Sequence, residues 1–258
     1  MMTNLLRNSY ATLVALFIAM FALPTTAQAQ IEYNLAVGGK VVTSDNCKDL
    51  SEIDGVSGTV NYEPKTKTLT LQDATIEGDI MYAISSDIYG LKIKVLGTNK
   101  INAQAYGIIF SRPTSIIGDG TLEIVGSDES GINTSGNTLT VEGCTLNVKG
   151  GKFGIRGYDG NHGEDITVKN AKITAEGTSE GSIGNIASLA MEGCAIIEPV
   201  GAAFDESLHG VALNGALVKD KVVIAPASAP VTEYELIIAG TKVNDKNCGN
   251  LSEIEGVK

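Results

Sequence analysis

The side chains best suited to chemistry gather in one polar stretch, residues 156–165, which reads RGYDGNHGED. Carboxylate and amide oxygens are the ligands that Ca²⁺ prefers, and this stretch supplies them at Asp159, Asn161, Glu164 and Asp165. The sequence therefore predicts a calcium site here, with Ca²⁺ as the one cofactor to consider. The spacing departs from the calcium loop of helix-loop-helix proteins, which has a glycine where Glu164 stands. The alternative is a solvated polar corner that holds no ion.

His162 lies in the same stretch and has one other histidine, His209, in the whole sequence. A zinc site or a general base built on His162 is therefore disfavoured. A polysaccharide lyase or glycoside hydrolase needs a carboxylate cluster beside a basic residue, or two carboxylates a few ångströms apart. No aspartate recurs in one column of the repeats described below. We therefore expect no catalytic residue and no enzyme, with a β-helix lyase or hydrolase as the alternative.

A second candidate site combines aromatic and guanidinium groups. Phe110, Arg112, Arg156 and Tyr158 each follow the third predicted strand of a repeat. On one shared face they would offer planar surfaces and bidentate donors to a carboxylated sugar. The sequence contains no tryptophan, so sugar stacking would fall on tyrosine or phenylalanine. We predict an acidic-glycan groove at these four residues.

The elements that carry these residues recur at intervals of 23, 23, 24, 27 and 23 residues. A small residue opens the second strand of each repeat, followed two positions later by an inward residue. A small residue and an isoleucine mark the third strand. The first column is Ala74, Gly97, Gly120, Cys144, Ala171 and Cys194, and the second is Ile76, Asn99, Leu122, Leu146, Ile173 and Ile196. Such a period, with alternating apolar residues and glycine corners, predicts an all-β, single-stranded parallel β-helix of about six coils over residues 63–224. An antiparallel β protein with regular hairpins is the alternative.

The sequences at the two ends of this solenoid do not follow the repeat. Residues 30–62 predict an N-terminal cap, with a hairpin about Gly38-Gly39 and a short helix over Cys47–Ile53. Residues 225–233 read as a linker. Residues 234–258 repeat the cap sequence at a constant offset of 201 positions, which indicates a tandem duplication, either as part of a longer tandem array or as a truncated second copy.

The first 29 residues read as a signal peptide. Arg7 precedes the apolar run 13–23, and Ala27-Gln28-Ala29 supplies a small-x-small cleavage site. We therefore expect an exported protein that is secreted or displayed at the cell surface, without membrane insertion after cleavage; a membrane anchor is the alternative. The formal net charge of −11 disfavours nucleic acid as a partner.

The sequence resembles a known class of bacterial proteins. The stretches YNLAVGGKVVTSDNC, GTVNYEPKTKTLTLQDATI and IIGDGTLEIVG are similar to secreted β-helix modules called carbohydrate-binding domain-containing proteins, whose fold is similar to that of pectate lyases. The resemblance covers residues 33–224 and again 234–257. It implies a role at the cell surface, either structural and adhesive or polysaccharide-binding, with polysaccharide as the possible partner. The shared residues are structural, so the resemblance assigns no binding residue.

The four cysteines of an exported protein raise the question of disulfides. Cys144 and Cys194 stand in one inward column with Ala171 between them. Two coils of about 4.8 Å each separate their Cα atoms by about 9.6 Å, beyond the reach of a disulfide. We predict buried free thiols at both positions. Cys47 and Cys248 hold equivalent places in the two cap copies, and each is expected to pack within its own copy.

Overall fold

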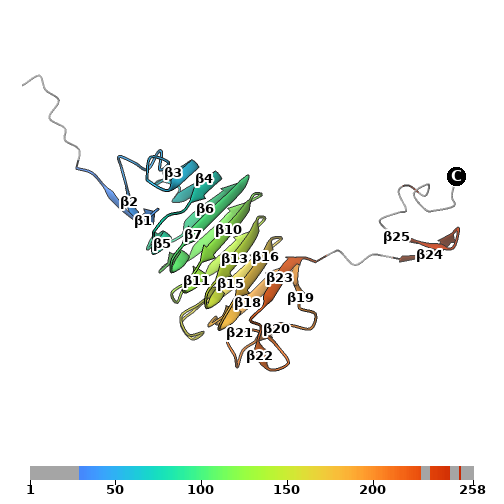
Figure 1. The fold of residues 1–258 in the computed structure, drawn as a ribbon. Helices are drawn as coiled ribbons and strands as arrows, with labels where there is room; N and C mark the ends of the chain where they lie inside the picture. The colour runs from blue at the N-terminus through green and yellow to red at the C-terminus, as the bar shows by residue number, and fades with distance from the viewer. Residues whose placement is uncertain (1–28, 228–232, 245–249, 251–258) are drawn as a thin grey trace, which may run out of the picture. The chain divides into compact units, whose positions relative to one another are not determined.

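The computed structural model describes residues 29–227, 233–244 and 250. Nearly all of the predicted signal peptide, Cys248 and much of the second cap copy lie outside these residues. Residues 32–227 form a parallel β-solenoid of about five turns, as the repeat spacing predicts (Figure 1). Within the described part of the chain there is no helix, and hence none that could cross a membrane.

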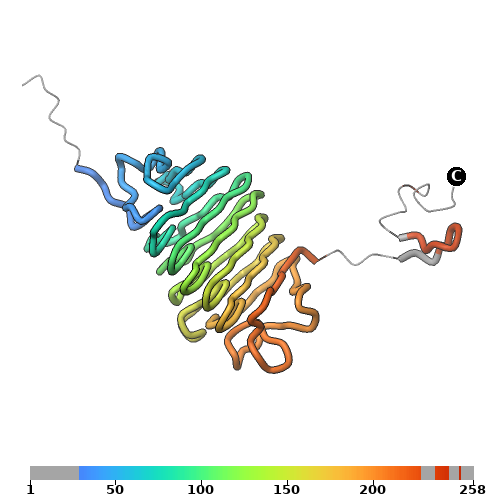
Figure 2. The backbone as a smooth tube through the Cα atoms, viewed as in Figure 1, coloured from blue at the N-terminus to red at the C-terminus, as the bar shows by residue number. Residues whose placement is uncertain are grey.

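Each coil contributes three strands, and Figure 2 shows the backbone winding through successive coils. The first strands are β6 (Leu91–Leu96), β9 (Thr114–Gly118), β12 (Leu139–Glu142), β15 (Asp165–Lys169) and β18 (Ser188–Glu192). The second strands are β7 (Thr98–Ala103), β10 (Thr121–Gly126), β13 (Thr145–Gly150) and β16 (Lys172–Gly177). The third strands are β5 (Tyr82–Ser86), β8 (Tyr106–Phe110), β11 (Ser130–Asn133), β14 (Phe153–Arg156) and β17 (Gly181–Gly184). In the first coil, β4 (Thr68–Ile76) pairs with β6 along one half and with β7 at its end.

The isoleucine column of the third strands is confirmed. Adjacent coils pair in parallel through Ile84, Ile108, Ile132, Ile155 and Ile183, each at most 1% exposed. The residue before each isoleucine is small for a steric reason. A Cβ on Gly131 would lie 2.4 Å from Cγ1 of Val148 on the opposite strand, so the interior leaves no room for one.

The second-strand column is confirmed in the middle of the stack and wrong in the first coil. Leu122 pairs with Leu146, and Leu146 with Ile173, as predicted. Ile76, however, pairs with Ile101 rather than with Asn99. The buried side chain of Asn99 lies instead against the bend in β4, where its Oδ1 accepts the N–H of Ala74 at 2.9 Å. The first coil is therefore shifted by two residues from the predicted alignment.

The sixth coil stacks only at its beginning. Its first strand, β18, pairs with β15, but β19 (Cys194–Glu198) does not reach β16. The strand β23 (Lys221–Pro226) lies between them and pairs antiparallel with both, so Ile224 separates Ile173 from Ile196. The predicted linker therefore begins too early, since Ala225 and Pro226 belong to β23. The short strands β20 (Ala203–Asp205), β21 (Gly210–Leu213) and β22 (Ala216–Leu217) extend the third-strand sheet beyond β17.

The N-terminal cap consists of strands and turns. β1 (Glu32–Val37) and β2 (Lys40–Thr43) form the predicted hairpin, and β3 (Val56–Glu63) pairs antiparallel with β4. The helix expected over Cys47–Ile53 is absent, and that prediction was wrong. Asn46 does not cap a helix, because its side chain accepts the N–H of Thr43 and donates to the carbonyl of Val41. Both bonds turn the chain back onto β2.

The second cap copy is described as a hairpin of β24 (Glu233–Ile238) and β25 (Thr241–Asn244). Its bounds and its pairs lie 201 positions after those of β1 and β2. Three cysteines are described, and all three are free thiols, as predicted: Cys47, Cys144 and Cys194. Cys144 is 1% exposed, as predicted. Cys194 is only partly buried, so the prediction of a buried thiol there was wrong, because its strand β19 lies at the end of the sheet beyond β23. Its thiol donates to the carbonyl of Ala171 in the preceding coil.

Candidate functional site

The polar corner between β14 and β15 is organised around one buried carboxylate. Glu164 is 0% exposed, and its Oε1 accepts the backbone N–H groups of Tyr158 and Asp159, each at 3.2 Å. Its Oε2 accepts the N–H of His162 at 2.8 Å. Burial by itself raises the pKa of Glu164, but the backbone donors outweigh it and hold the pKa below its ordinary value. The corner is thus folded around an anionic side chain.

The exposed part of the corner is a pair formed by Asp159 and His162. Asp159 Oδ1 lies 2.7 Å from His162 Nδ1. This hydrogen bond lowers the pKa of Asp159 and raises that of His162. The His162 ring also meets the ring of Tyr158 edge to face at 5.7 Å. Asp159 and His162 therefore use these hydrogen-bonding atoms to bind each other rather than a substrate.

Of the four residues predicted to bind calcium, Asp159 and Glu164 bring ligand atoms close together, with His162 beside them. Ligand atoms of Asp159, His162 and Glu164 lie within 4.8 Å of one another. Asp165 is turned away, and its Oδ1 accepts the hydroxyl of Ser188 at 2.5 Å. Asn161 donates its backbone N–H to Asp159. Since Glu164 already accepts three backbone donors, the alternative of a structural polar corner fits these contacts better than a calcium cage.

The four residues of the predicted acidic-glycan groove are not brought together. Phe110 is 1% exposed and belongs to the core, so it offers no face to a ligand. It lies two positions after the inward Ile108, and the period of two in a strand turns both inward. Arg112 is paired with Asp87 at 3.0 Å, and Tyr158 is exposed on the polar corner. Arg156 lies in β14, and its side chain contacts Glu129 on the outer face of the third-strand sheet.

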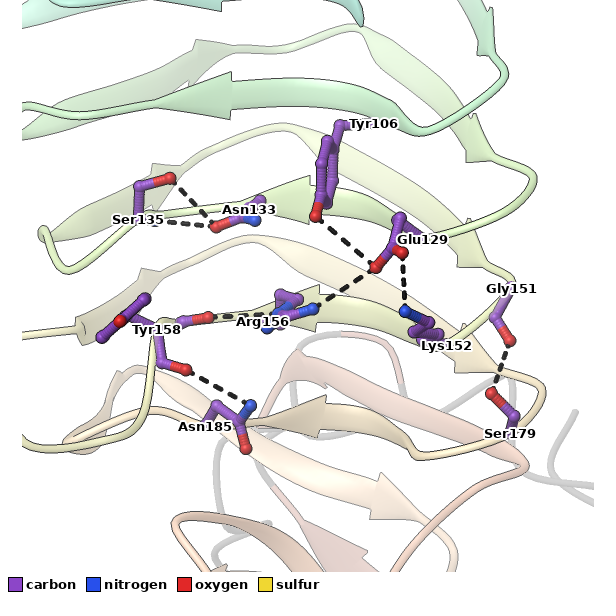
Figure 3. A network of polar contacts seen from close by, with 11 residues as sticks. Tyr106, Glu129, Asn133, Ser135, Gly151, Lys152, Arg156, Tyr158, Ser179 and Asn185 are labelled. Atoms are coloured by element: carbon purple, nitrogen blue, oxygen red, sulfur yellow. Dashed lines mark hydrogen bonds and ion pairs between the residues drawn. The ribbon is translucent and has the colours of Figure 1, made fainter. Parts of the chain in front are cut away.

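That outer face carries a feature that the sequence interpretation missed. Tyr82 on β5 and Tyr106 on β8 stack with ring centroids 5.8 Å apart and planes at 19°. The Tyr106 hydroxyl lies 3.5 Å from Oε2 of Glu129. In Figure 3, Tyr106, Glu129, Lys152 and Arg156 point toward one another from neighbouring coils. The recurrence of tyrosine two positions before Ile84 and Ile108 was the available signal.

One carboxylate, Glu129, pairs with both cations of this network. Glu129 binds Lys152 Nζ at 2.6 Å and Arg156 Nη1 at 3.5 Å. The bond to Glu129 raises the pKa of Lys152. Arg156 also lies over the ring of Phe153, 5.7 Å from its centroid. Both cations therefore already have Glu129 as a partner on this face.

An open groove of about 550 Å³ lies on the same face, between the cap hairpin and the first two coils. Tyr33 and Tyr82 contribute aromatic walls, and Ala36, Val41 and Ile109 add apolar surface. Hydrogen-bonding groups come from Asn34, Ser85, Ser86 and Ser111, and negative charge from Glu32 and Asp87. Grooves that bind small organic ligands commonly combine apolar walls with a few polar groups. This groove is the candidate binding site, which we call the Tyr82 groove.

Comparison with protein-family models, with curated proteins and with solved structures finds no match to this chain.

Proposed function

We propose that this chain is an exported, non-catalytic module that binds polysaccharide in the Tyr82 groove. The observation that carries the proposal is the combination of the stacked Tyr82 with hydroxyl and amide groups in one open groove. Sugars present apolar C–H faces and polar hydroxyl edges, and such a groove matches both. The signal-peptide pattern and the resemblance to secreted β-helix modules support export.

The charges of the groove favour a neutral glycan over an acidic one. Glu32 and Asp87 are its charged residues, and both are negative. The cation Arg112 is already paired with Asp87. A uronic acid placed here would meet like charge without a free partner, which is unfavourable. The proposed ligand is therefore an uncharged sugar, rather than the carboxylated sugar that the sequence predicts.

The solenoid also gives the groove a rigid frame. Tyr82, Ser85 and Ser86 lie on β5, whose two neighbours are β1 and β8. A wall fixed by two backbone ladders loses little conformational freedom when a ligand binds. An extended polysaccharide can cross such an open groove, whereas a closed pocket would accept only a chain end.

The test is a glycan array and titration of the protein without residues 1–29. We expect retention of neutral polysaccharides, and a loss of affinity of about tenfold or more for Tyr82→Ala, because one lost sugar contact of about 1.4 kcal/mol changes the affinity tenfold. Tyr89→Ala is the matched control, since Tyr89 is 68% exposed and does not line the groove. Equal affinity of both variants would contradict the site.

Two results would favour another function. Failure to retain any glycan would point to a structural or adhesive spacer, which a stiff stack of coils can also provide. Cleavage of a polysaccharide would point to the lyase or hydrolase alternative. Incubation with a calcium chelator should leave glycan retention unchanged, because no proposed contact passes through an ion.

A further inference from the structure

The chain contains two versions of one hairpin. β1 pairs with β2 through Ala36 with Val41 and Val37 with Lys40, and β24 pairs with β25 through Ile237 with Lys242 and Ile238 with Thr241. Both ladders have their irregularity at the same place. The two hairpins therefore have one architecture, 201 positions apart.

Their turns also share an unusual backbone conformation. Gly38 and Gly39 have φ angles of 58° and 73°, and Ala239 and Gly240 have 48° and 81°. Two consecutive left-handed residues are typical of the two-residue turn that matches the twist of a hairpin. Ala239 adopts this conformation although its Cβ disfavours it. The second hairpin thus keeps the geometry of the first in spite of a less suitable residue.

The two hairpins differ in what covers them. Leu35 and Val37 are 2% and 0% exposed, since they close the end of the solenoid core. The equivalent Leu236 is 51% exposed, and Ile238 is only partly buried. Among the described residues, β24 pairs with β25 alone. The strand β24 therefore exposes positions that are buried in β1, whereas Val243 on β25 is 3% exposed and stays buried like its equivalent Val42.

The partner of the first hairpin is known in detail. β1 lies antiparallel to β5, with Leu35, Ala36 and Val37 opposite Ser86, Ser85 and Ile84. Backbone bonds at both ends of the pair complete it, from Gly38 N–H to the Ala83 carbonyl at 2.8 Å and from Asp87 N–H to the Asn34 carbonyl at 2.9 Å. A strand with the geometry of β24 can make the same backbone bonds, because they do not depend on side-chain identity.

We propose that β24–β25 of one molecule binds the β5 edge of a second copy of this chain in place of that copy's own β1–β2 hairpin. The contact is strand addition, in which backbone bonds supply affinity and the apolar face supplies register. Leu236 and Ile238 then occupy the places of Leu35 and Val37. Because donor and acceptor surfaces differ, the contact is head-to-tail and extends into chains or closes into rings.

The incoming β24–β25 hairpin competes with the β1–β2 hairpin that is covalently attached to the same solenoid. β1–β2 is joined to its own solenoid by a short connection and so acts at a high effective concentration. Dimers are therefore expected to form weakly and to increase with protein concentration. A change that weakens the β1–β2 hairpin should promote the exchange, and the same change in β24–β25 should suppress it.

Because weakening the two hairpins should have opposite effects on the exchange, Leu35→Ala and Leu236→Ala form a matched pair of variants. Both are made in the chain without residues 1–29. We expect Leu35→Ala to raise the oligomer fraction several-fold in analytical ultracentrifugation, and Leu236→Ala to lower it to that of a chain truncated after residue 227. Equal oligomer fractions for the two variants would overturn the proposal. So would a wild-type chain that stays monomeric at every concentration measured.

A cross-link locates the contact. With Cys194 and Cys248 replaced by Ser, the pair Ser85→Cys and Ile237→Cys should form an intermolecular disulfide under mild oxidation, seen as a ladder on a non-reducing gel. The control pair Ser85→Cys and Ala36→Cys should close within one molecule, because Ser85 faces Ala36. Closure of the control without a ladder from the test pair contradicts the exchange. A disulfide between the two introduced thiols of the test pair within one monomer also contradicts it, since the hairpin would then cover its own solenoid.

Discussion

Asn99 holds the backbone of Ala74 in the preceding coil, with 2.9 Å between its Oδ1 and the Ala74 nitrogen. Its Nδ2 donates to the carbonyl of Leu96 at 2.9 Å and to that of Thr121 at 3.2 Å. The side chain is 1% exposed, so one buried amide satisfies backbone groups in three successive coils. The bend that lets β4 supply two strands of the first coil depends on this contact.

We expect Asn99→Leu to destabilise the protein, although leucine is the residue found at Leu122 and Leu146 in the same column. One buried N–H and two partly buried carbonyl groups would lose a partner, and an unsatisfied buried group costs about 1–3 kcal/mol. The net loss should be about 2 kcal/mol or more in urea unfolding. Leu122→Met, which preserves volume, is the control and should cost less than about 1.5 kcal/mol. Unchanged stability of Asn99→Leu would show that the amide bonds do not matter.

Glu164→Gln should destabilise the polar corner by about 2 kcal/mol at neutral pH, since bonds to a charged acceptor contribute about 1.5–3 kcal/mol. The pKa of folded Glu164 lies below the ordinary value of 4.5. Its stabilisation is therefore complete above that value and is lost as the pH falls through the folded pKa. Thermal unfolding from pH 7 to pH 3 should show the difference between wild type and variant shrinking with acid. A difference that stays constant with pH would contradict this account, and Glu123→Gln, at an exposed position of β10, serves as the control.

The thiols should differ sharply in reactivity. Burial raises the pKa of Cys144 to about 11. At pH 8 only roughly one Cys144 in a thousand is then a thiolate, the form that reacts. Alkylation of the folded protein followed by peptide mapping should label Cys194 before Cys144 and leave Cys144 unlabelled. Unfolding without reductant should make all four thiols reactive. Two thiols after unfolding would reveal a disulfide.

Gly131→Ala should cost about 1–3 kcal/mol, because an added methyl in a filled core forces its neighbours apart. The methyl would lie 2.4 Å from Cγ1 of Val148 and 2.9 Å from the carbonyl oxygen of Lys149. Ala83, which precedes Ile84 in the same column, already carries a side chain. The control Ala83→Gly should therefore cost only about 0.5–1 kcal/mol of backbone entropy. Equal effects of the two substitutions in urea unfolding would contradict the steric argument.

The sequence alone determined the solenoid. Ile108, Ile132 and Ile155 recur with a small residue before each, because stacked coils repeat the same interior contacts at each level. Such short-range, periodic constraints are visible in a single chain. The duplication of the cap hairpin is visible for the same reason, and the structure confirms it in the register of β24 and β25.

Only the tertiary structure decided how the strands pair at the end of the repeat and which partners the side chains of the corners contact. β23 enters between β16 and β19 because the open edge of β16 accepts an antiparallel strand as readily as a parallel one, and no local pattern distinguishes the two. The Tyr82 groove likewise depends on where the cap hairpin meets β5, a contact between residues about 50 positions apart in sequence. Alternation within β8 already turned Phe110 inward, but the partners of Arg156 and Glu164 follow from how the chain bends between strands. The sequence therefore specifies the coils, and the packing of coils against cap and loops creates the candidate site.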